Sequence, residues 1–114
     1  MNRDEEIIVT DETTGGQRGK KLARFDLIPA EPLWELARLY GAGAAKYKDR
    51  NWERGYAWSL SFAAMQRHAW LFWSGESRDP GTLCHHLASV VFHAFALMEF
   101  EARGHGVDDR PGEL

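Results

Sequence analysis

The order of hydrophobic and polar residues predicts three helices behind a polar start. The first is expected from about Ala30, because apolar side chains then recur every three or four residues as far as Ala44. The second is expected from about Ser59, a favourable N-cap, to Ser74, and Gly75 supplies its stop. Because this second stretch is apolar on nearly every side, we predict a central helix or one shared with another subunit.

The third helix is expected to begin at Asp79 and Pro80, which suit the N-cap and the first helical position, and to end before Gly104. Its predicted apolar face consists of Leu83, Leu87, Val90, Val91, Ala94, Phe95 and Met98. Residues 46–58, between the first two helices, mix charged and aromatic side chains without a clear period. This mixture indicates a closing loop.

Both ends of the chain are polar. Residues 1–20 are predicted to be a flexible N-terminal arm, in which only residues 7–10 resemble a strand, either mobile or at a sheet edge. Residues 21–103 are predicted to form one helical domain, and residues 104–114 a polar C-terminal tail. The expected fold class is therefore all-α, a small bundle of about three main helices.

Aromatic residues change this picture by suggesting an oligomer. The chain has 114 residues, among them five Trp, six Phe and three Tyr. A chain of this length can bury only one small core. The excess aromatic surface therefore predicts packing against copies of the same chain, as a dimer or a tetramer.

Charge and cysteine content narrow the choice of partners and of compartment. A net charge of -3 argues against binding to a nucleic-acid polymer, because such proteins usually carry a strongly basic surface. Cys84 is the only cysteine, which excludes an internal disulfide and a cysteine-based zinc cage and fits a reducing cytoplasm. No stretch approaches the roughly 18 apolar residues that cross a bilayer, so no membrane partner is expected.

Acidic side chains gather at two places. Glu31 and Glu35 lie at i and i+4 on one face of the first predicted helix, where two carboxylates could supply half of a Mg²⁺ site. Glu76 and Asp79 have the spacing E-x-x-D, just before the third helix. Both pairs also fit a simpler interpretation as solvated charges, with Asp79 acting only as a helix cap.

Histidines occupy unusually apolar surroundings. His86 and His93 share one face of the third predicted helix with Ser89, where an imidazole can bind a metal, orient a carboxylate or simply be hydrogen-bonded in the core. Arg67 and His68 interrupt the apolar second helix. Since burying an unpaired charge is costly, Arg67 is expected to reach solvent, an acid or a phosphate.

The closing loop combines cations with aromatic rings. Lys46, Arg50 and Asn51 suit phosphate binding, and Tyr47 and Trp52 offer rings on which a base can stack. The alternative is a basic, aromatic loop that only covers the core. The sequence contains neither a G-x-x-x-x-G-K-[ST] phosphate loop nor a G-x-S-x-G elbow, which removes two familiar enzyme designs.

Several short motifs occur in order between residues 20 and 101. They are R-F-D-L-I-P (24–29), E-L-A (35–37), G-A-x-x-Y (43–47), R-N-W-E-R-G (50–55), R-H (67–68), G-E-x-x-D-P (75–80) and H-L-A (86–88). Together they resemble the phage dATP/dGTP pyrophosphohydrolases, which include MazZ-like proteins of phages that replace adenine by 2-aminoadenine and belong to the MazG-like group of nucleotide pyrophosphatases.

The resemblance implies an all-α, metal-dependent enzyme that cleaves dGTP or dATP to the monophosphate and pyrophosphate. In a phage this reaction would supply dGMP for synthesis of the 2-aminoadenine nucleotide, in the cytoplasm of the infected bacterium. The wider group binds Mg²⁺ through an E-x-x-E pair and an E-x-x-D pair. This chain has no E-x-x-E, and its only E-x-x-D is formed by Glu76 and Asp79.

By position, the resemblance assigns the metal ligands and the other site residues. The ligands of Mg²⁺ or Mn²⁺ would be Glu35, Glu76, Asp79 and His86. The catalytic candidates are Glu31, Glu35 and His68, and the substrate-binding candidates are Lys46, Tyr47, Arg50, Asn51, Trp52 and Arg67. Two alternatives stay open: a non-catalytic helical dimerisation module, and a hydrolase with a transition metal held by His86 and His93.

Overall fold

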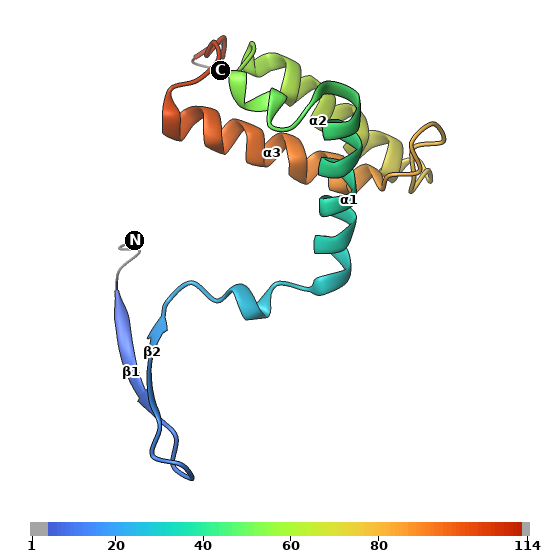
Figure 1. The fold of residues 1–114 in the computed structure, drawn as a ribbon. Coiled ribbons are helices and arrows are strands. Elements are labelled where there is room, and N and C mark those ends of the chain that lie inside the picture. Colours follow the sequence, from blue (N-terminus) through green and yellow to red (C-terminus); the bar gives the residue numbers. More distant parts are fainter. Residues whose placement is uncertain (1–4, 113–114) are drawn as a thin grey trace. The chain divides into compact units, whose positions relative to one another are not determined.

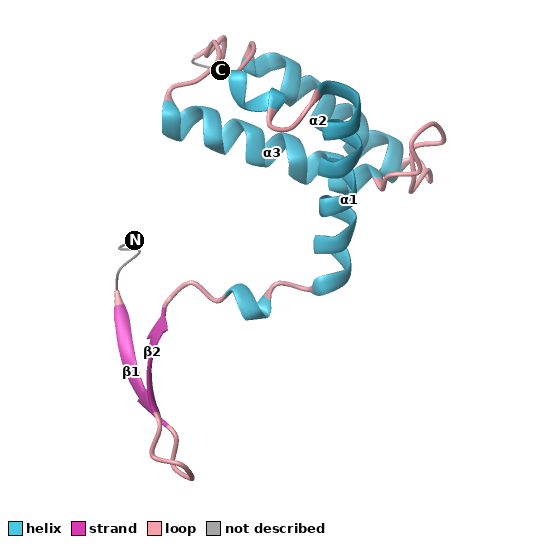
Figure 2. Cartoon of the chain, viewed as in Figure 1, coloured by secondary structure: helices cyan, strands magenta, loops and turns pink. Residues whose placement is uncertain are grey.

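The computed structural model of the chain describes residues 5–112. Two compact units are present, Met1–Ala30 and Glu31–Leu114. The first contains two strands and the short 3-10 helix η1 (Phe25–Leu27), and the second is helical (Figures 1 and 2). The all-α prediction therefore describes the second unit and omits a small sheet.

The small sheet is a hairpin of β1 (Glu6–Thr10) and β2 (Gln17–Lys21), paired antiparallel. Its turn is closed by Asp11, whose side chain accepts hydrogen bonds from the backbone N–H groups of Thr13 and Thr14, both at 2.8 Å. The sequence indicated β1 only, because β2 reads Q-R-G-K-K and is held by backbone pairing without an apolar face. The predicted arm thus contains a hairpin, and its first residues, 1–4, lie outside the described residues.

The helical unit is built from α1 (Ala30–Tyr47), α2 (Trp58–Trp73) and α3 (His86–Arg103). A 3-10 helix, η2 (Asn51–Arg54), lies in the segment that was predicted to be a closing loop. Within the described residues, no helix has both the length and the hydropathy that crossing a membrane requires.

The N-termini of two helices differ from the prediction. Ser59 does not cap α2, because its backbone N–H and its hydroxyl both bond to the carboxylate of Asp109. The third helix begins at His86 instead of Asp79, since Asp79 Oδ1 is used to close a turn with the N–H groups of Gly81 and Thr82. The cap of α3 is instead the ring Nδ1 of His85, which accepts from the N–H of Leu87.

The core lies where α2 and α3 pack side by side (Figure 1). Trp58, Ala96 and Phe100 form its buried centre, with Trp52 and Tyr56 packed around them. The predicted apolar face of α3 is partly wrong, because the structure leaves Leu83, Leu87, Val91, Phe95 and Met98 exposed. The helix is apolar on two sides, and periodicity alone does not tell which side meets its neighbour; the small Ala88 and Ala96 fit the side that does.

The C-terminal segment is folded against the start of α2. Val107 exchanges backbone hydrogen bonds with this region, from its N–H to Tyr56 at 3.2 Å and from Trp58 N–H to its carbonyl at 3.0 Å. The indole Nε1 of Trp58 donates to the carbonyl of His105 at 2.9 Å. The predicted polar tail is therefore part of the helical unit as far as residue 112, and residues 113–114 lie outside the described residues.

Candidate functional site

Polar side chains line the contact between α2 and α3. Ser61 and His68 lie seven residues apart on α2, and His86 and His93 lie seven apart on α3, so each pair occupies one helix face. The two helices run in opposite directions, which places His68 against His86 and Ser61 against His93. The ring nitrogens Nδ1 of His68 and His86 are 2.8 Å apart, and Ser61 Oγ lies 2.9 Å from His93 Nδ1.

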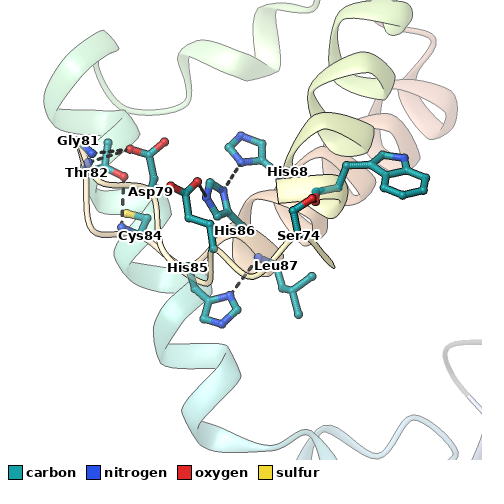
Figure 3. A network of polar contacts seen from close by, with 11 residues as sticks. His68, Ser74, Asp79, Gly81, Thr82, Cys84, His85, His86 and Leu87 are labelled. Carbon is teal, nitrogen blue, oxygen red and sulfur yellow. Dashed lines mark hydrogen bonds and ion pairs between the residues drawn. The ribbon is translucent and has the colours of Figure 1, made fainter. Parts of the chain in front are cut away.

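His86 is the centre of a three-residue relay (Figure 3). Its side chain is 1% exposed, and its Nε2 lies 2.8 Å from Glu76 Oε2. An ionised carboxylate only accepts hydrogen bonds, so His86 Nε2 carries the hydrogen. In the arrangement in which His86 accepts at Nδ1, the donor is the Nδ1–H of His68.

This relay fixes the chemical state of His68. Because its hydrogen is on Nδ1, the neutral ring presents a lone pair at Nε2. Burial is the main cause that lowers the pKa of His68, assisted by the positive charge of Arg67. His68 is thus an imidazole whose Nε2 has no hydrogen-bond partner among residues 5–112 and whose lowered pKa favours the neutral form, which suits a proton acceptor or a metal ligand.

Asp79 adds a second carboxylate to this group (Figure 3). The backbone N–H groups of Thr82 and Gly81 bond to its Oδ1 and hold its pKa below the usual value. A positive charge on His86 or His68, when either ring is protonated, would lower the pKa of Asp79 further. Its Oδ2 has no hydrogen-bond partner among the described residues, so this oxygen is available to a ligand.

Glu35 is placed differently from the other predicted ligands. It accepts hydrogen bonds from both terminal nitrogens of Arg78, at 3.0 and 2.6 Å. This bond from Arg78 is the main cause that holds the pKa of Glu35 below its ordinary value. Arg78 also donates to the carbonyl of Leu83, so the ion pair ties α1 to the segment between α2 and α3.

The predicted substrate-binding residues are dispersed. Lys46 lies over the ring of Tyr47, 4.9 Å from its centroid, and Arg50 pairs with Glu53 at 3.1 Å. Trp52 packs in the aromatic core, 6.0 Å from the ring centroid of Phe100.

The remaining predicted residues are exposed at helix surfaces or ends. Asn51 begins η2, Glu31 lies in the first turn of α1, and Arg67 is exposed next to His68. Across residues 5–112, none of the predicted substrate-binding residues is hydrogen-bonded to the His68–His86–Glu76 relay. The assignments of substrate, catalytic and metal residues stay predictions.

A second relay was not predicted from the sequence. Tyr56 Oη lies 2.5 Å from Ser61 Oγ, which in turn contacts His93 Nδ1. Ser61 is fully buried, and burial lowers the pKa of His93 to about 4. The sequence did contain one signal for this relay, the seven-residue spacing that places Ser61 and His68 on one face of α2. The spacing indicates a relay only when that face is known to pack against α3.

The carboxylates near the relay can be compared with what a divalent cation needs. Within the described part of the chain, no three His, Cys, Asp or Glu side chains are grouped so that they alone could hold an ion. Mg²⁺ does not need such a cage, since it usually takes one or two carboxylates and completes its shell with water and substrate phosphates. Glu76 and Asp79 each keep one carboxylate oxygen without a hydrogen bond to residues 5–112.

The fold and the site define a class: a small helical protein with histidines at the contact between two helices and carboxylates in the segment that joins those helices. The family model described as dATP/dGTP diphosphohydrolase, N-terminal, matches residues 12–110. The chain therefore belongs to the dATP/dGTP diphosphohydrolase family, which confirms the resemblance and the enzyme class. Comparison with curated proteins and with solved structures gave no match.

Proposed function

We propose that this chain hydrolyses dGTP and dATP to the deoxynucleoside monophosphate and pyrophosphate. The observation that carries the proposal is the family match across residues 12–110. The geometry supports it independently, because Glu76, His86 and His68 form a relay that ends in a basic nitrogen beside a second carboxylate, Asp79.

In this proposal His68 Nε2 accepts the proton of the attacking water. The water oxygen forms a bond to the α-phosphorus, the bond from that phosphorus to the bridging oxygen breaks, and pyrophosphate leaves. Glu76 and His86 hold the His68 ring in the required tautomer. Glu31 lies outside this relay and is the alternative base suggested by the sequence.

The proposed ligands of Mg²⁺ or Mn²⁺ are Glu76 and Asp79, together with Glu35. When bound, such an ion neutralises charge on phosphate oxygens and lowers the pKa of a coordinated water. Both ring nitrogens of His86 are already hydrogen-bonded, so His86 can act as a ligand only by giving up one of these bonds. Its orienting role is therefore the one that this geometry favours.

Substrate recognition is assigned to the exposed cations and rings. The phosphate oxygens would be bound by Lys46, Arg50 and Arg67. Asn51 would contribute beside Arg50, which it follows at the start of η2. Tyr47 is 55% exposed and offers the accessible ring for the purine, whereas the ring of Trp52 already contacts Phe100. A phage role, with dGMP supplied for the 2-aminoadenine nucleotide in the host cytoplasm, rests on the resemblance alone.

The functional unit is proposed to be a homo-oligomer, a dimer or a tetramer. Large apolar side chains of α2 and α3 remain exposed along the helix pair: Leu60, Phe62, Trp70, Trp73, Leu87, Val91, Phe95 and Met98. Exposed apolar side chains in such number on a small unit are typical of an interaction surface. A second copy of the chain presents the matching surface by symmetry.

The test of the proposed reaction is product analysis. The full chain is incubated with Mg²⁺ and each dNTP in turn, and the products are separated by ion-exchange chromatography. The expected products are dGMP or dAMP with pyrophosphate. Orthophosphate with a deoxynucleoside diphosphate, or no turnover of either purine nucleotide, would overturn the proposal. His68→Gln, which keeps a polar side chain without a basic nitrogen, is expected to lose the activity.

A further inference from the structure

Tyr56, Ser61 and His93 form a hydrogen-bonded row that ends at a half-buried imidazole. Tyr56 Oη lies 2.5 Å from Ser61 Oγ, and Ser61 Oγ lies 2.9 Å from His93 Nδ1. Ser61 is fully buried, so its hydroxyl has no solvent with which to exchange these partners. The row joins the segment before α2, α2 itself and α3 through side chains alone.

The direction of the hydrogens in this row follows from the chemistry of its members. A phenol is a stronger donor than an aliphatic hydroxyl, and a neutral imidazole nitrogen is a strong acceptor. The favoured order is therefore Tyr56 O–H to Ser61 and Ser61 O–H to His93 Nδ1. The reverse order would leave the phenol hydrogen without an acceptor among residues 5–112. A neutral His93 that accepts at Nδ1 carries its hydrogen on Nε2.

The hydrogen bonds of His93 leave its Nε2 atom unused within residues 5–112. It has no hydrogen-bond partner among the described residues, and none of their buried side-chain nitrogens or oxygens lacks a partner. The atom is therefore not completely enclosed by residues 5–112. The ring of His93 also stacks on that of His68, with centroids 6.3 Å apart and planes at 20°.

The two stacked rings differ in the atom that carries the hydrogen. The Glu76–His86 relay puts the hydrogen of His68 on Nδ1 and leaves a lone pair on Nε2, whereas the Tyr56–Ser61 row puts the hydrogen of His93 on Nε2. One ring can thus accept a proton while the other donates a hydrogen bond. The donor is neutral, because burial lowers the pKa of His93 to about 4.

We propose that Tyr56 and Ser61 are positioning residues that hold His93 as the Nε2–H tautomer, and that His93 Nε2–H donates to a phosphate oxygen of the nucleotide. The substrate contact rests on the proposed function; the tautomer does not. A neutral donor holds the oxygen without competing for the proton that His68 accepts. His93 is then a binding residue that the sequence motifs did not assign.

The first test measures the tautomer without any nucleotide. Nitrogen-15 NMR of the histidine-labelled full chain distinguishes Nδ1–H from Nε2–H rings, and His93 is expected to give the Nε2–H pattern. In Ser61→Ala the pattern is expected to change to a mixture of tautomers. Tyr56→Phe keeps the ring but removes the hydroxyl, and it is expected to change the pattern in the same direction. A Nδ1–H pattern in the wild type, or an unchanged pattern in a folded Ser61→Ala or Tyr56→Phe variant, would overturn the proposal.

The second test measures the contact with substrate. Ser61→Ala is expected to lower kcat/KM for dGTP by roughly 10-fold or more, as loss of a residue that orients a functional side chain usually does. Ser74→Ala is the matched control, because its hydroxyl, on the residue just after α2, bonds only to the carbonyl of Trp70 at 2.8 Å. Equal kinetics of the wild type and Ser61→Ala would overturn the contact while leaving the proposed function intact. A wild type without turnover would overturn the function and the contact together, and the NMR result on the tautomer would stand.

Discussion

Glu35 and Arg78 form a two-bonded ion pair that connects α1 to the segment between α2 and α3, with nitrogen–oxygen distances of 3.0 and 2.6 Å. The same segment carries Glu76 and Asp79, so the pair ties Glu35, a predicted metal ligand, to the segment that carries two others. Arg78 also donates to the carbonyl of Leu83, and this bond within the segment holds its two parts together. Glu35 thus has a structural role in this ion pair beside its proposed role as a metal ligand, and variants can separate the two.

Glu35→Gln is expected to lower kcat/KM for dGTP by about 100-fold or more while leaving helicity unchanged, because an amide is a poor ligand for Mg²⁺. Arg78→Gln removes the partner and leaves the carboxylate in place, so its loss of activity is expected to be smaller. Steady-state kinetics at several Mg²⁺ concentrations and circular dichroism provide the measurements. Equal losses in the two variants would show that Glu35 acts only through the ion pair.

The stability of the chain is expected to fall in mildly acid solution. His93 titrates near the ordinary pKa of about 6.5 when the chain is unfolded, but burial lowers its pKa to about 4 in the folded state. The unfolded chain therefore binds more protons between these values, and stability decreases as pH falls from about 6.5 to about 4. The lowered pKa of His68 acts in the same direction.

This pH dependence is measured by urea unfolding at a series of pH values. The free energy of unfolding of the wild type is expected to be constant above neutral pH and to decline below it. His93→Gln removes the titrating ring and is expected to flatten the decline. An equally steep decline in this variant would contradict a contribution from His93, whose ionisable neighbours are His68 and Arg67.

Two glycines of the C-terminal segment allow the effect of backbone strain on stability to be separated from the effect of a steric overlap. Gly104 and Gly106 both have a left-handed φ, +68° and +71°, which costs another residue roughly 1–2 kcal/mol. A Cβ at Gly104 would meet nothing within 4 Å, whereas one at Gly106 would overlap the Tyr56 carbonyl oxygen. Gly106→Ala is therefore expected to lower the free energy of unfolding by at least about 1 kcal/mol more than Gly104→Ala.

Thermal and urea unfolding of the two alanine variants measure this difference. The C-terminal segment bonds to the backbone of Tyr56, the residue whose hydroxyl contacts Ser61. Gly106→Ala is consequently also expected to disturb the His93 ring, and Gly104→Ala is not. Equal stability of the two variants would mean that the segment does not pack on Tyr56 in solution.

The sequence predicted those features that depend on local patterns. The start of α1 at Ala30 and the glycine at position 104 after α3 are confirmed, because caps and breakers act within one turn. The spacing also placed His86, Ser89 and His93 on one face of α3, and the structure buries His86 and Ser89 of that face. Such features need no knowledge of the rest of the chain.

The features that were missed depend on contacts between distant segments. Asp79 could cap a helix or a turn, and the turn forms because Arg78 and His85 pair in a short bridge just around it. The role of the Ser61 hydroxyl could not be predicted because its partners belong to other elements: Tyr56 lies in a loop and His93 on another helix. The C-terminal segment is polar in composition, yet backbone bonds through Val107 hold it to α2, and composition does not report backbone bonds.

The exposed apolar side of α3 leads to a prediction about assembly. Val91 and Phe95 lie one turn apart and are 38% and 46% exposed, so neither is needed for the core of the single chain. Phe95→Glu is expected to weaken self-association by about 100-fold or more, because it places an unpaired carboxylate in an apolar contact, and to leave helicity unchanged. Ala102→Glu, which introduces the same charge at another exposed position of α3, is the control and is expected to assemble like the wild type. Size-exclusion chromatography with light scattering gives the masses at several concentrations. A monomeric wild type, or a Phe95→Glu variant that assembles as well as Ala102→Glu, would show that this side of α3 is not an interface between copies of the chain.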